Sequence, residues 1–221
     1  MPSRTRTYGQ FCGLARALEI IGERWSLLIV RDLVLGPKRL NELRDGLPSV
    51  SPDVLAVRLT DLEDAGVLRR GATGVYELTE YGGELDHILV DLGLWGARSL
   101  SRPGPEENFT LDAAILALYT AFRSETAGGV QLNFEIHQHD TMVLHALVDD
   151  GALKVAEGRY PGADLIIRTA AGPGLLDVIG GSVTPFAAVS SGKVQLEGDF
   201  ADFALFARIF HVAGEPDALA A

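Results

Sequence analysis

A proline–glycine–proline run at residues 103–105 constrains the fold most, because neither residue type continues a helix. The balance of charge also differs on the two sides of this run. Residues 1–102 carry 13 basic and 14 acidic residues, whereas residues 103–221 carry 6 basic and 16 acidic residues. A chain of 221 residues has room for two compact domains. We therefore predict one domain at residues 1–102 and a second at residues 108–221.

The composition is that of a folded protein without a membrane segment. Apolar residues make up 47% of the sequence and charged residues 22%, which is ordinary for globular domains. The longest apolar runs are far shorter than the roughly 18 residues that a membrane helix requires. The N-terminus lacks the apolar segment of a secretory signal, and a single cysteine cannot form an internal disulfide. We expect a cytoplasmic protein that does not associate with membranes.

The spacing of apolar residues in the first half predicts a mainly α domain of short helices. The expected helices cover about residues 14–21, 24–35, 40–46 and 51–65, and two strands follow at 67–70 and 75–78. Ser51 is the expected N-cap of the fourth helix, and Pro52 suits its first position. This order of elements is that of a winged helix-turn-helix.

A long helix is expected to follow the second strand, with Thr79 as its N-cap. Its apolar residues have heptad-like spacing and are Leu85, Ile88, Leu92 and Trp95. We expect this stripe to form a dimer interface together with the first helix of a partner subunit. The alternative is that the stripe is buried within one small domain.

The second half predicts an α+β layer fold. Residues 130–137 alternate apolar and polar side chains, which predicts a half-buried strand. Asp149, Asp150 and Gly151 lie between two apolar runs and predict a hairpin turn. The other expected elements are strands at 142–148, 153–156, 164–169 and 193–197, and helices at 111–122, 175–179, 185–190 and 199–212.

A family pattern runs through the first half of the chain. It consists of residues 12–29 (CGLARALEIIGERWSLLI), 36–43 (GPKRLNEL), 47–51, 55–66, 76–82 and 92–96. In this order the segments resemble the HxlR-type winged-helix transcription regulators, and the resemblance covers about residues 8–100. It implies a homodimer that binds operator DNA and controls transcription. The turn at residues 71–74 is shorter than in the family and lacks the family's proline and basic residues.

A second pattern covers about residues 110–212. It consists of residues 150–153, 162–169, 180–181 and 191–199 (SGKVQLEGD). These segments are similar to the sterol-carrier-protein (SCP) domain, the fold of lipid carriers with an apolar tunnel. The resemblance implies an SCP-like module that binds an apolar ligand or contacts another protein.

The helix at residues 51–65 is the expected recognition helix. If its leucines face inward, Pro52, Asp53 and Val57 face outward near its first turn, where they can reach base edges in the major groove. Asp53 can accept a hydrogen bond from cytosine or serve only as a charge on the helix dipole. Pro52 and Val57 can meet a thymine methyl group.

Phosphate contacts require cations or N–H donors at the surface that faces the duplex. The expected contacts are Lys38, Arg39, Ser51, Arg58, Arg69 and Arg70. The alternative is that these cations are solvated or form ion pairs within the domain. Asp61, Glu63 and Asp64 are near enough in sequence to pair with Arg58.

Cys12 is the one cysteine of the chain. The family resemblance implies an oxidation sensor in this region, acting by linking subunits or by modification of the thiol. Such reactivity requires a lowered thiol pKa, for which Arg16 is the nearby cation. The alternative is a small buried apolar residue.

The sequence contains little that indicates a metal site, a cofactor site or an active site. His137, His139 and His145, with Asp140, do not have the spacing of a metal-ligand set, so we expect no metal. Phosphate-binding loops and catalytic triads are not visible either. We expect no cofactor and no enzymatic activity.

The last helix has an apolar arc that is wider than one buried face requires. It can wall a cavity for an apolar ligand, and the expected lining residues are Leu176, Ile179, Phe186, Phe200, Phe203, Phe206 and Phe210. The alternative is a filled core. The sequence therefore predicts a dimeric DNA-binding regulator that responds to an apolar ligand or to thiol oxidation. The alternative function is a lipid carrier whose winged helix makes only protein contacts.

Overall fold

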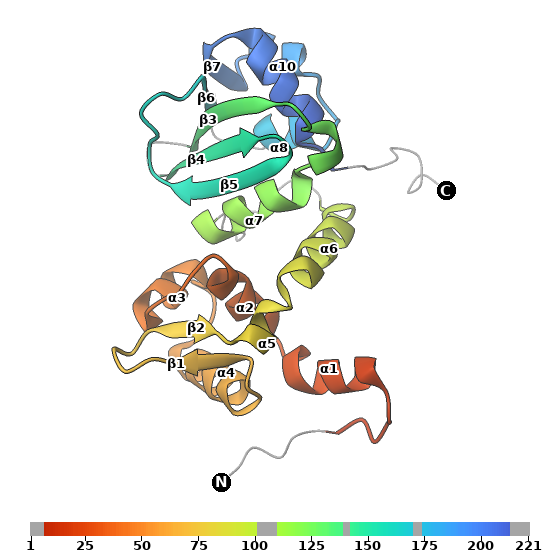
Figure 1. The fold of residues 1–221 in the computed structure, drawn as a ribbon, viewed down its shortest axis with the longest axis vertical. Coiled ribbons are helices and arrows are strands. Elements are labelled where there is room, and N and C mark those ends of the chain that lie inside the picture. Colours follow the sequence, from red (N-terminus) through yellow and green to blue (C-terminus); the bar gives the residue numbers. More distant parts are fainter. Residues whose placement is uncertain (1–6, 101–109, 139–141, 170–173, 213–221) are drawn as a thin grey trace. The chain divides into compact units, whose positions relative to one another are not determined.

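The structure is a computed structural model that describes residues 7–100, 110–138, 142–169 and 174–212. The chain divides into two compact units, unit 1 (Met1–Asp91) and unit 2 (Leu92–Ala221) (Figure 1). The proline–glycine–proline run on which the expected domain division rests lies outside the described residues. Among the described helices, none has both the length and the apolar character needed to cross a membrane.

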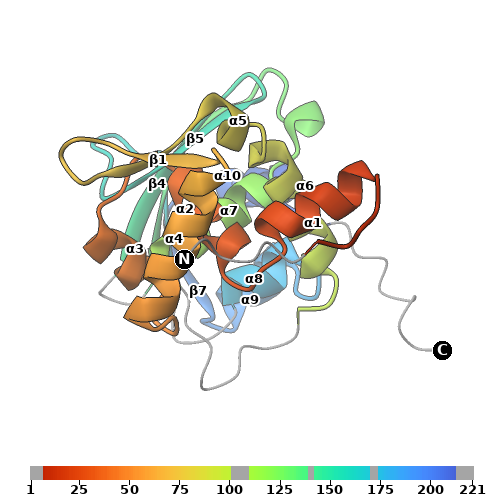
Figure 2. The same ribbon diagram turned by 90° about the horizontal axis from the view of Figure 1, so that it is seen from below.

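Unit 1 contains the expected helices followed by an antiparallel hairpin. The elements are α1 (Gly13–Ile21), α2 (Ser26–Val34), α3 (Leu40–Gly46), α4 (Pro52–Asp64), β1 (Leu68–Arg70), β2 (Tyr76–Leu78) and α5 (Glu80–Gly83). The turn between β1 and β2 projects from the helices of this unit (Figures 1 and 2). Ile29, Leu43 and Leu55 are fully buried in its core.

Helix α2 begins two residues later than predicted. Trp25 has a φ of 82°, a left-handed conformation that an α-helix cannot contain. Trp25 is therefore the residue that precedes the helix rather than part of it. The Arg24 guanidinium lies 5.2 Å from the centre of the Trp25 ring.

The long helix predicted from Thr79 is divided into α5 and α6 (Asp86–Ala97). The Thr79 hydroxyl does cap α5, because it accepts a hydrogen bond from the Gly82 amide at 3.1 Å. Gly82 lies so close to β1 that a Cβ at this position would be 1.9 Å from the Val67 carbonyl oxygen. Two adjacent glycines also weaken the helix, and the next one begins at Asp86.

Unit 2 contains a five-stranded sheet in the order β5-β4-β3-β6-β7. The parallel pair is β3–β6, and the other neighbours are antiparallel. The strands are β3 (Gln131–Gln138), β4 (Met142–Asp149), β5 (Ala152–Glu157), β6 (Leu165–Thr169) and β7 (Val194–Gly198). The helices are α7 (Leu111–Ala121), a 3-10 turn (Ser124–Thr126), α8 (Gly174–Ile179), α9 (Pro185–Ser190) and α10 (Phe200–Ile209).

The predicted hairpin turn joins β4 to β5. Asp150 and Gly151 both have positive φ angles, 44° and 82°, which is the conformation of a type I′ turn. This turn matches the twist of the two strands and fixes their pairing, with Asp149 opposite Ala152.

The apolar face of the sheet packs against α10. Phe134 of β3 and Phe203, Phe206 and Phe210 near the end of the chain are all fully buried. The rings of Phe206 and Phe210 stack with centroids 4.8 Å apart, and Phe134 contacts both rings edge-on. The aromatic side chains therefore fill the core of unit 2.

The polar face of β3 was predicted to be open to solvent, but Glu135 and His137 are only 4% and 6% exposed. The connection from β5 to β6 must pass β4 and β3, because β5 and β6 lie on opposite sides of that pair. This connection is fixed to β3 by hydrogen bonds from the Tyr160 amide to Glu135 and from the Asn133 amide to Asp164. It buries the side chains beneath it.

Candidate functional site

Helix α4 presents an exposed N-terminal half. The Ser51 hydroxyl accepts a hydrogen bond from the Val54 amide at 3.4 Å, so Ser51 is the N-cap as predicted. Leu55, Leu59 and Leu62 are buried, as the apolar spacing predicted. The opposite face is exposed and carries Pro52, Asp53, Ala56, Val57 and Thr60. Small and polar groups on this face are free to approach another molecule.

Arg39 is an exposed cation at the start of α3. Its backbone amide donates to the Glu42 carboxylate at 2.5 Å, which orients the first turn of the helix. Its side chain forms no ion pair with any residue that the structure describes. Neighbouring Lys38 pairs with Tyr76 through two backbone hydrogen bonds of 2.8 and 2.9 Å, so the start of α3 is tied to β2.

Three other predicted cations already have partners within unit 1. Arg58 is half-buried and forms ion pairs with Asp61 at 2.9 Å and Glu23 at 3.7 Å. Arg69 is exposed but donates to Glu77 at 2.8 Å. These are the ion pairs within the domain that the sequence left open as an alternative.

The third partnered cation, Arg70, lies 5.4 Å from the centre of the Tyr76 ring. A cation–π contact of this kind leaves the N–H donors of the guanidinium available. Arg70 is exposed at the end of β1, so it can contact an anion without giving up this partner.

Cys12 is exposed and directly precedes α1. Hydrogen bonds from the backbone amides of Ala15 and Leu14 lower the pKa of its thiol. Arg16, the cation expected to do this, instead pairs with Glu19 at 3.0 Å. The alternative of a buried apolar cysteine is therefore wrong, and the helix N-terminus is what favours the thiolate.

Three of the four residues of the apolar stripe at 85–95 lie on α6 and are exposed. Ile88 and Leu92 are exposed, and Trp95 is 73% exposed. Leu85 is half-buried. Leu85 packs against the core of unit 1, whereas the other three residues of the stripe are exposed within this one chain.

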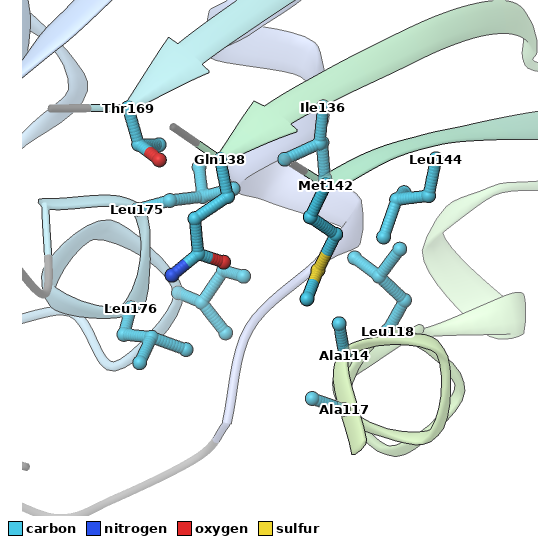
Figure 3. Close-up of a pocket in the computed structure, with 11 residues that line it drawn as sticks. Ala114, Ala117, Leu118, Ile136, Gln138, Met142, Leu144, Thr169, Leu175 and Leu176 are labelled. Atoms are coloured by element: carbon cyan, nitrogen blue, oxygen red, sulfur yellow. The ribbon is translucent and has the colours of Figure 1, made fainter. Parts of the chain in front are cut away.

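Unit 2 contains a small apolar cavity between α7, α8 and the ends of β3, β4 and β6 (Figure 3). Its volume is about 50 Å³. Leu176 and Ile179 line it, as predicted for a ligand site. Gln138 and Thr169 also line it and were not predicted, because a single polar residue at a strand end has no distinctive sequence signal.

The predicted aromatic residues are not part of this cavity. Phe203, Phe206 and Phe210 are buried in the filled core, where ring stacking leaves no space. Phe186 and Phe200 are exposed and contact each other with ring centroids 6.4 Å apart. The burial and ring packing of Phe203, Phe206 and Phe210 favour the filled core that the sequence left open as the alternative.

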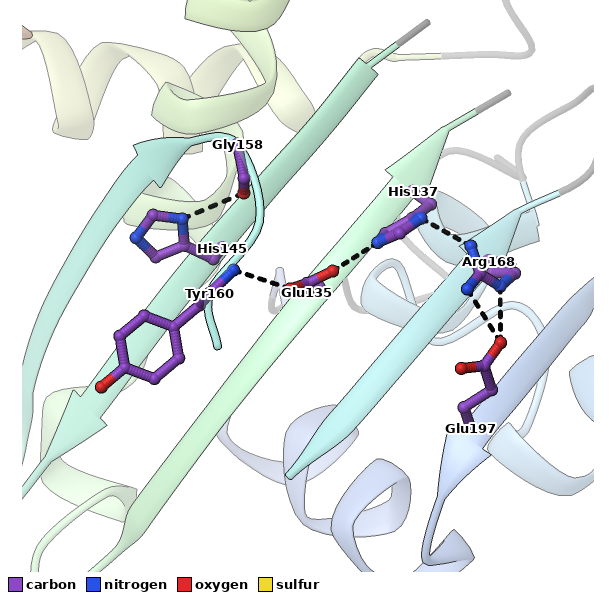
Figure 4. A network of polar contacts seen from close by, with 7 residues as sticks. All are labelled: Glu135, His137, His145, Gly158, Tyr160, Arg168 and Glu197. Atoms are coloured by element: carbon purple, nitrogen blue, oxygen red, sulfur yellow. Dashed lines mark hydrogen bonds and ion pairs between the residues drawn. The ribbon is translucent and has the colours of Figure 1, made fainter. Parts of the chain in front are cut away.

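A network of charged side chains lies on the polar face of the sheet (Figure 4). Arg168 donates to His137 Nδ1 at 2.6 Å, and His137 Nε2 lies 2.5 Å from the Glu135 carboxylate. Because a guanidinium only donates, His137 Nδ1 is the acceptor of the Arg168 bond and Nε2 is the donor to Glu135. Arg168 also binds Glu197 through two nitrogens at 2.8 and 3.0 Å.

The pKa of Glu135 is set by opposing effects. Burial raises it, but the hydrogen bonds from His137 and from the Tyr160 amide outweigh burial and leave it below its ordinary value. Each charged group in this network has a partner, so the network is suited to holding the β5–β6 connection in place rather than to reacting.

Metal ligation has no site among the residues that the structure describes, since no three acidic, histidine or cysteine residues gather there. His145 instead lies 3.0 Å from the Gly158 carbonyl oxygen and stacks on Tyr160. His139 and Asp140 lie outside the described residues.

Comparison with known proteins places similarity in the first half of the chain. Residues 20–103 match the HxlR-like helix-turn-helix family. The transcriptional regulator YtcD of Bacillus subtilis is 34% identical over 105 residues, which cover 45% of this chain and 83% of YtcD. YodB, a transcriptional regulator of the same organism, is 33% identical over 94 residues, or 40% of this chain and 83% of YodB. The crystal structure of quinone-bound YodB covers 38% of this chain and 96% of its own, with 34% identity and a TM-score of 0.37.

Proposed function

The chain belongs to the HxlR-like helix-turn-helix family, and we propose that it is a dimeric transcription regulator that binds operator DNA through unit 1. The observation that carries this proposal is the exposed face at the start of α4, together with the exposed cation Arg39 at the start of α3. An α-helix fits the major groove of B-form DNA, where its first turns reach base edges.

The base contacts are proposed for Pro52, Asp53 and Val57. Asp53 is an acceptor for the cytosine amino group, and the two apolar side chains suit thymine methyl groups. Phosphate contacts are proposed for Lys38, Arg39, Ser51, Arg58, Arg69 and Arg70. Arg39 needs no rearrangement, whereas Arg58 must leave Asp61 to reach a phosphate. We therefore rank Arg39 above Arg58 as a contributor.

The acidic second half is an unsuitable surface for DNA. Residues 103–221 carry 6 basic against 16 acidic residues, so their field repels phosphates. The first half has nearly equal numbers of basic and acidic residues. Its cations can therefore attract a phosphate that lies within a Debye length of them. This difference in charge supports DNA contact by the first half of the chain and a separate role for the second half.

Dimer formation is proposed through the exposed stripe of α6 together with the exposed apolar residues of α1. Leu14 and Leu18 of α1 are exposed, as are Ile88, Leu92 and Trp95 of α6. Exposed apolar side chains at helical spacing favour burial against a second copy. A two-fold dimer presents two recognition helices, which implies a palindromic operator with half-sites about one helical turn apart.

Two inputs are proposed for regulation. The first is oxidation of Cys12, whose thiol is exposed and has a lowered pKa. The second is a small molecule bound in unit 2, which we propose to have an SCP-like fold. The cavity of about 50 Å³ is far below the roughly 300 Å³ or more of common ligand sites, which argues against a lipid carrier.

DNA binding measured as a function of salt tests the proposal. The duplex is obtained by selection from random sequences, and binding is followed by fluorescence anisotropy. Arg39→Ala is expected to lower the slope of log affinity against log salt by about one. Lys154→Ala is the matched control, because Lys154 is an exposed cation of unit 2. Wild-type protein that binds no duplex contradicts the proposed DNA binding. An unchanged slope in Arg39→Ala contradicts the phosphate contact of Arg39.

A further inference from the structure

We propose that α4 reads the pyrimidine edge of the operator and binds 5-methylcytosine more tightly than unmodified cytosine. The proposal rests on the DNA contact proposed above and specifies the base chemistry that this contact recognises. It depends on what the exposed face of α4 offers to the major groove, which is a carboxylate acceptor beside an apolar side chain.

The outward-facing side chains of α4 form one row along the helix. At 3.6 residues per turn, Asp53, Val57 and Thr60 lie within about 60° of each other, on the side opposite the buried leucines. Asp53 and Val57 are four residues apart, so their Cβ atoms are about 5–6 Å apart. Successive bases of one strand are about 3.4 Å apart, so the two side chains can reach one base or two neighbouring bases.

Guanine readout has no suitable side chain on this face. Arginine and lysine are the residues that most often pair with guanine O6 and N7. The structure describes all of α4, and none of the exposed residues of this helix is basic. Arg58, which belongs to α4, is half-buried and pairs with Asp61 at 2.9 Å. The Thr60 hydroxyl donates to the Ala56 carbonyl oxygen at 3.1 Å, so its proton is already engaged. Base readout by α4 therefore depends on an acceptor and on apolar contacts.

Pyrimidines present two groups to the major groove, one at C4 and one at C5. Cytosine has an amino donor at C4 and no methyl group, whereas thymine has a carbonyl acceptor at C4 and a methyl group at C5. The ionised Asp53 carboxylate only accepts, so it binds the amino group and repels the thymine carbonyl. Val57 gains free energy by burying a C5 methyl group. 5-Methylcytosine carries both the amino and the methyl group, so it matches both side chains.

The test places four bases in turn at each pyrimidine of one half-site of the selected duplex and measures affinity by fluorescence anisotropy. Cytosine and 5-methylcytosine are paired with guanine, and uracil and thymine with adenine, so the members of each pair differ by one methyl group. At one position the methyl group is expected to raise the affinity about fourfold within each pair. 5-Methylcytosine is expected to bind about fivefold or more tightly than thymine there, because thymine places a carbonyl oxygen against Asp53.

Two variants assign the two preferences to their side chains. Val57→Ala is expected to remove the methyl preference and keep the amino preference, and alanine is favourable at this exposed helix position. Asp53→Asn is expected to remove the amino preference and keep the methyl preference, because an amide both donates and accepts. Asp64→Asn is the matched control for charge and is expected to keep both preferences. Asp64 is exposed at the other end of α4, about 16 Å along the helix from Asp53.

The outcomes separate this inference from the proposed function. Wild-type protein that binds no duplex overturns the proposed DNA contact and the base readout with it. Specific binding to the selected duplex, with equal affinities within each pair at every position, overturns the pyrimidine readout and leaves the regulator intact. A methyl preference that persists in Val57→Ala, or an amino preference that persists in Asp53→Asn, overturns the assignment to that side chain.

Discussion

Charged side chains are used differently in the two units. In unit 1 the cations near α3, α4 and β1 are mostly exposed, and Arg39 forms no ion pair with the described residues. In unit 2 Glu135 and His137 are buried and every charge in their network has a partner. The two units therefore differ in burial, because the ion pairs of Arg58 and Arg69 in unit 1 are half-buried or exposed, whereas unit 2 uses buried charge to hold its own fold together.

The largest expected effect is on the network of unit 2. His137→Ala removes the group between Glu135 and Arg168 and leaves a buried carboxylate with only the Tyr160 amide. Removing one partner of a buried pair costs about 3–5 kcal/mol of stability. Denaturant unfolding followed by circular dichroism measures this loss.

Glu197→Gln is the control for the network, because Glu197 is exposed and its pair with Arg168 is screened by solvent. Its expected cost is below about 1 kcal/mol. Equal losses of stability in His137→Ala and Glu197→Gln contradict the view that the buried contacts of the network contribute most of its stabilisation.

The next effect concerns DNA affinity in unit 1. Arg39→Ala is expected to weaken binding more than Arg58→Ala, because Arg58 already pairs with Asp61 and Glu23. Both variants are expected to weaken binding to all duplex sequences alike, since phosphate contacts carry no sequence information. Anisotropy titrations with a selected and a scrambled duplex measure the ranking, and the reverse order shows that Arg58 exchanges its partners for phosphate.

A smaller effect is expected at the start of α4. Ser51→Ala removes the hydroxyl that accepts from the Val54 amide and is expected to cost about 1 kcal/mol of stability. Ser51→Asp restores an acceptor and is expected to recover the stability but to weaken DNA binding, because it adds a negative charge beside phosphate. Thermal unfolding measures the contribution of Ser51 as a helix cap, and anisotropy measures its contribution to DNA binding.

The pH dependence of stability distinguishes the units further. The pKa of Glu135 is lowered in the folded state, so its stabilising contribution is fully present above its ordinary pKa of 4.5 and is lost as the pH falls below it. Glu135→Gln is expected to flatten the fall in unfolding free energy below pH 4.5. A slope identical to that of the wild-type protein means that other carboxylates dominate acid unfolding.

Local features of the fold were readable from the sequence. Ser51 and Thr79 cap helices as predicted, and Asp150 and Gly151 form the predicted turn. The inward face of α4 also follows from its leucine spacing. Each of these depends on residues within one turn or one strand of each other, so the sequence order already contains the interacting partners.

The candidate sites were only partly readable. The outward face of α4 follows from periodicity, but the partners of Arg58 and Arg69 depend on which side chains the fold brings near. The cavity is a space between α7, α8 and three strands, and no stretch of sequence contains it. The aromatic residues of α10 are compatible with a cavity wall or with a filled core. The spacing of apolar residues along the helix is the same in both cases, so it does not distinguish them.

The sequence by itself determined the order of helices and strands, their caps and turns, and which face of each element is apolar. Tertiary structure decided the rest. It placed Gly82 against the Val67 carbonyl oxygen, where a side chain would collide. It also buried Glu135 and His137 because the β5–β6 connection crosses their strand. The physical reason is that propensity and periodicity act between neighbours in the chain, whereas burial and ion pairing depend on residues that are distant in sequence.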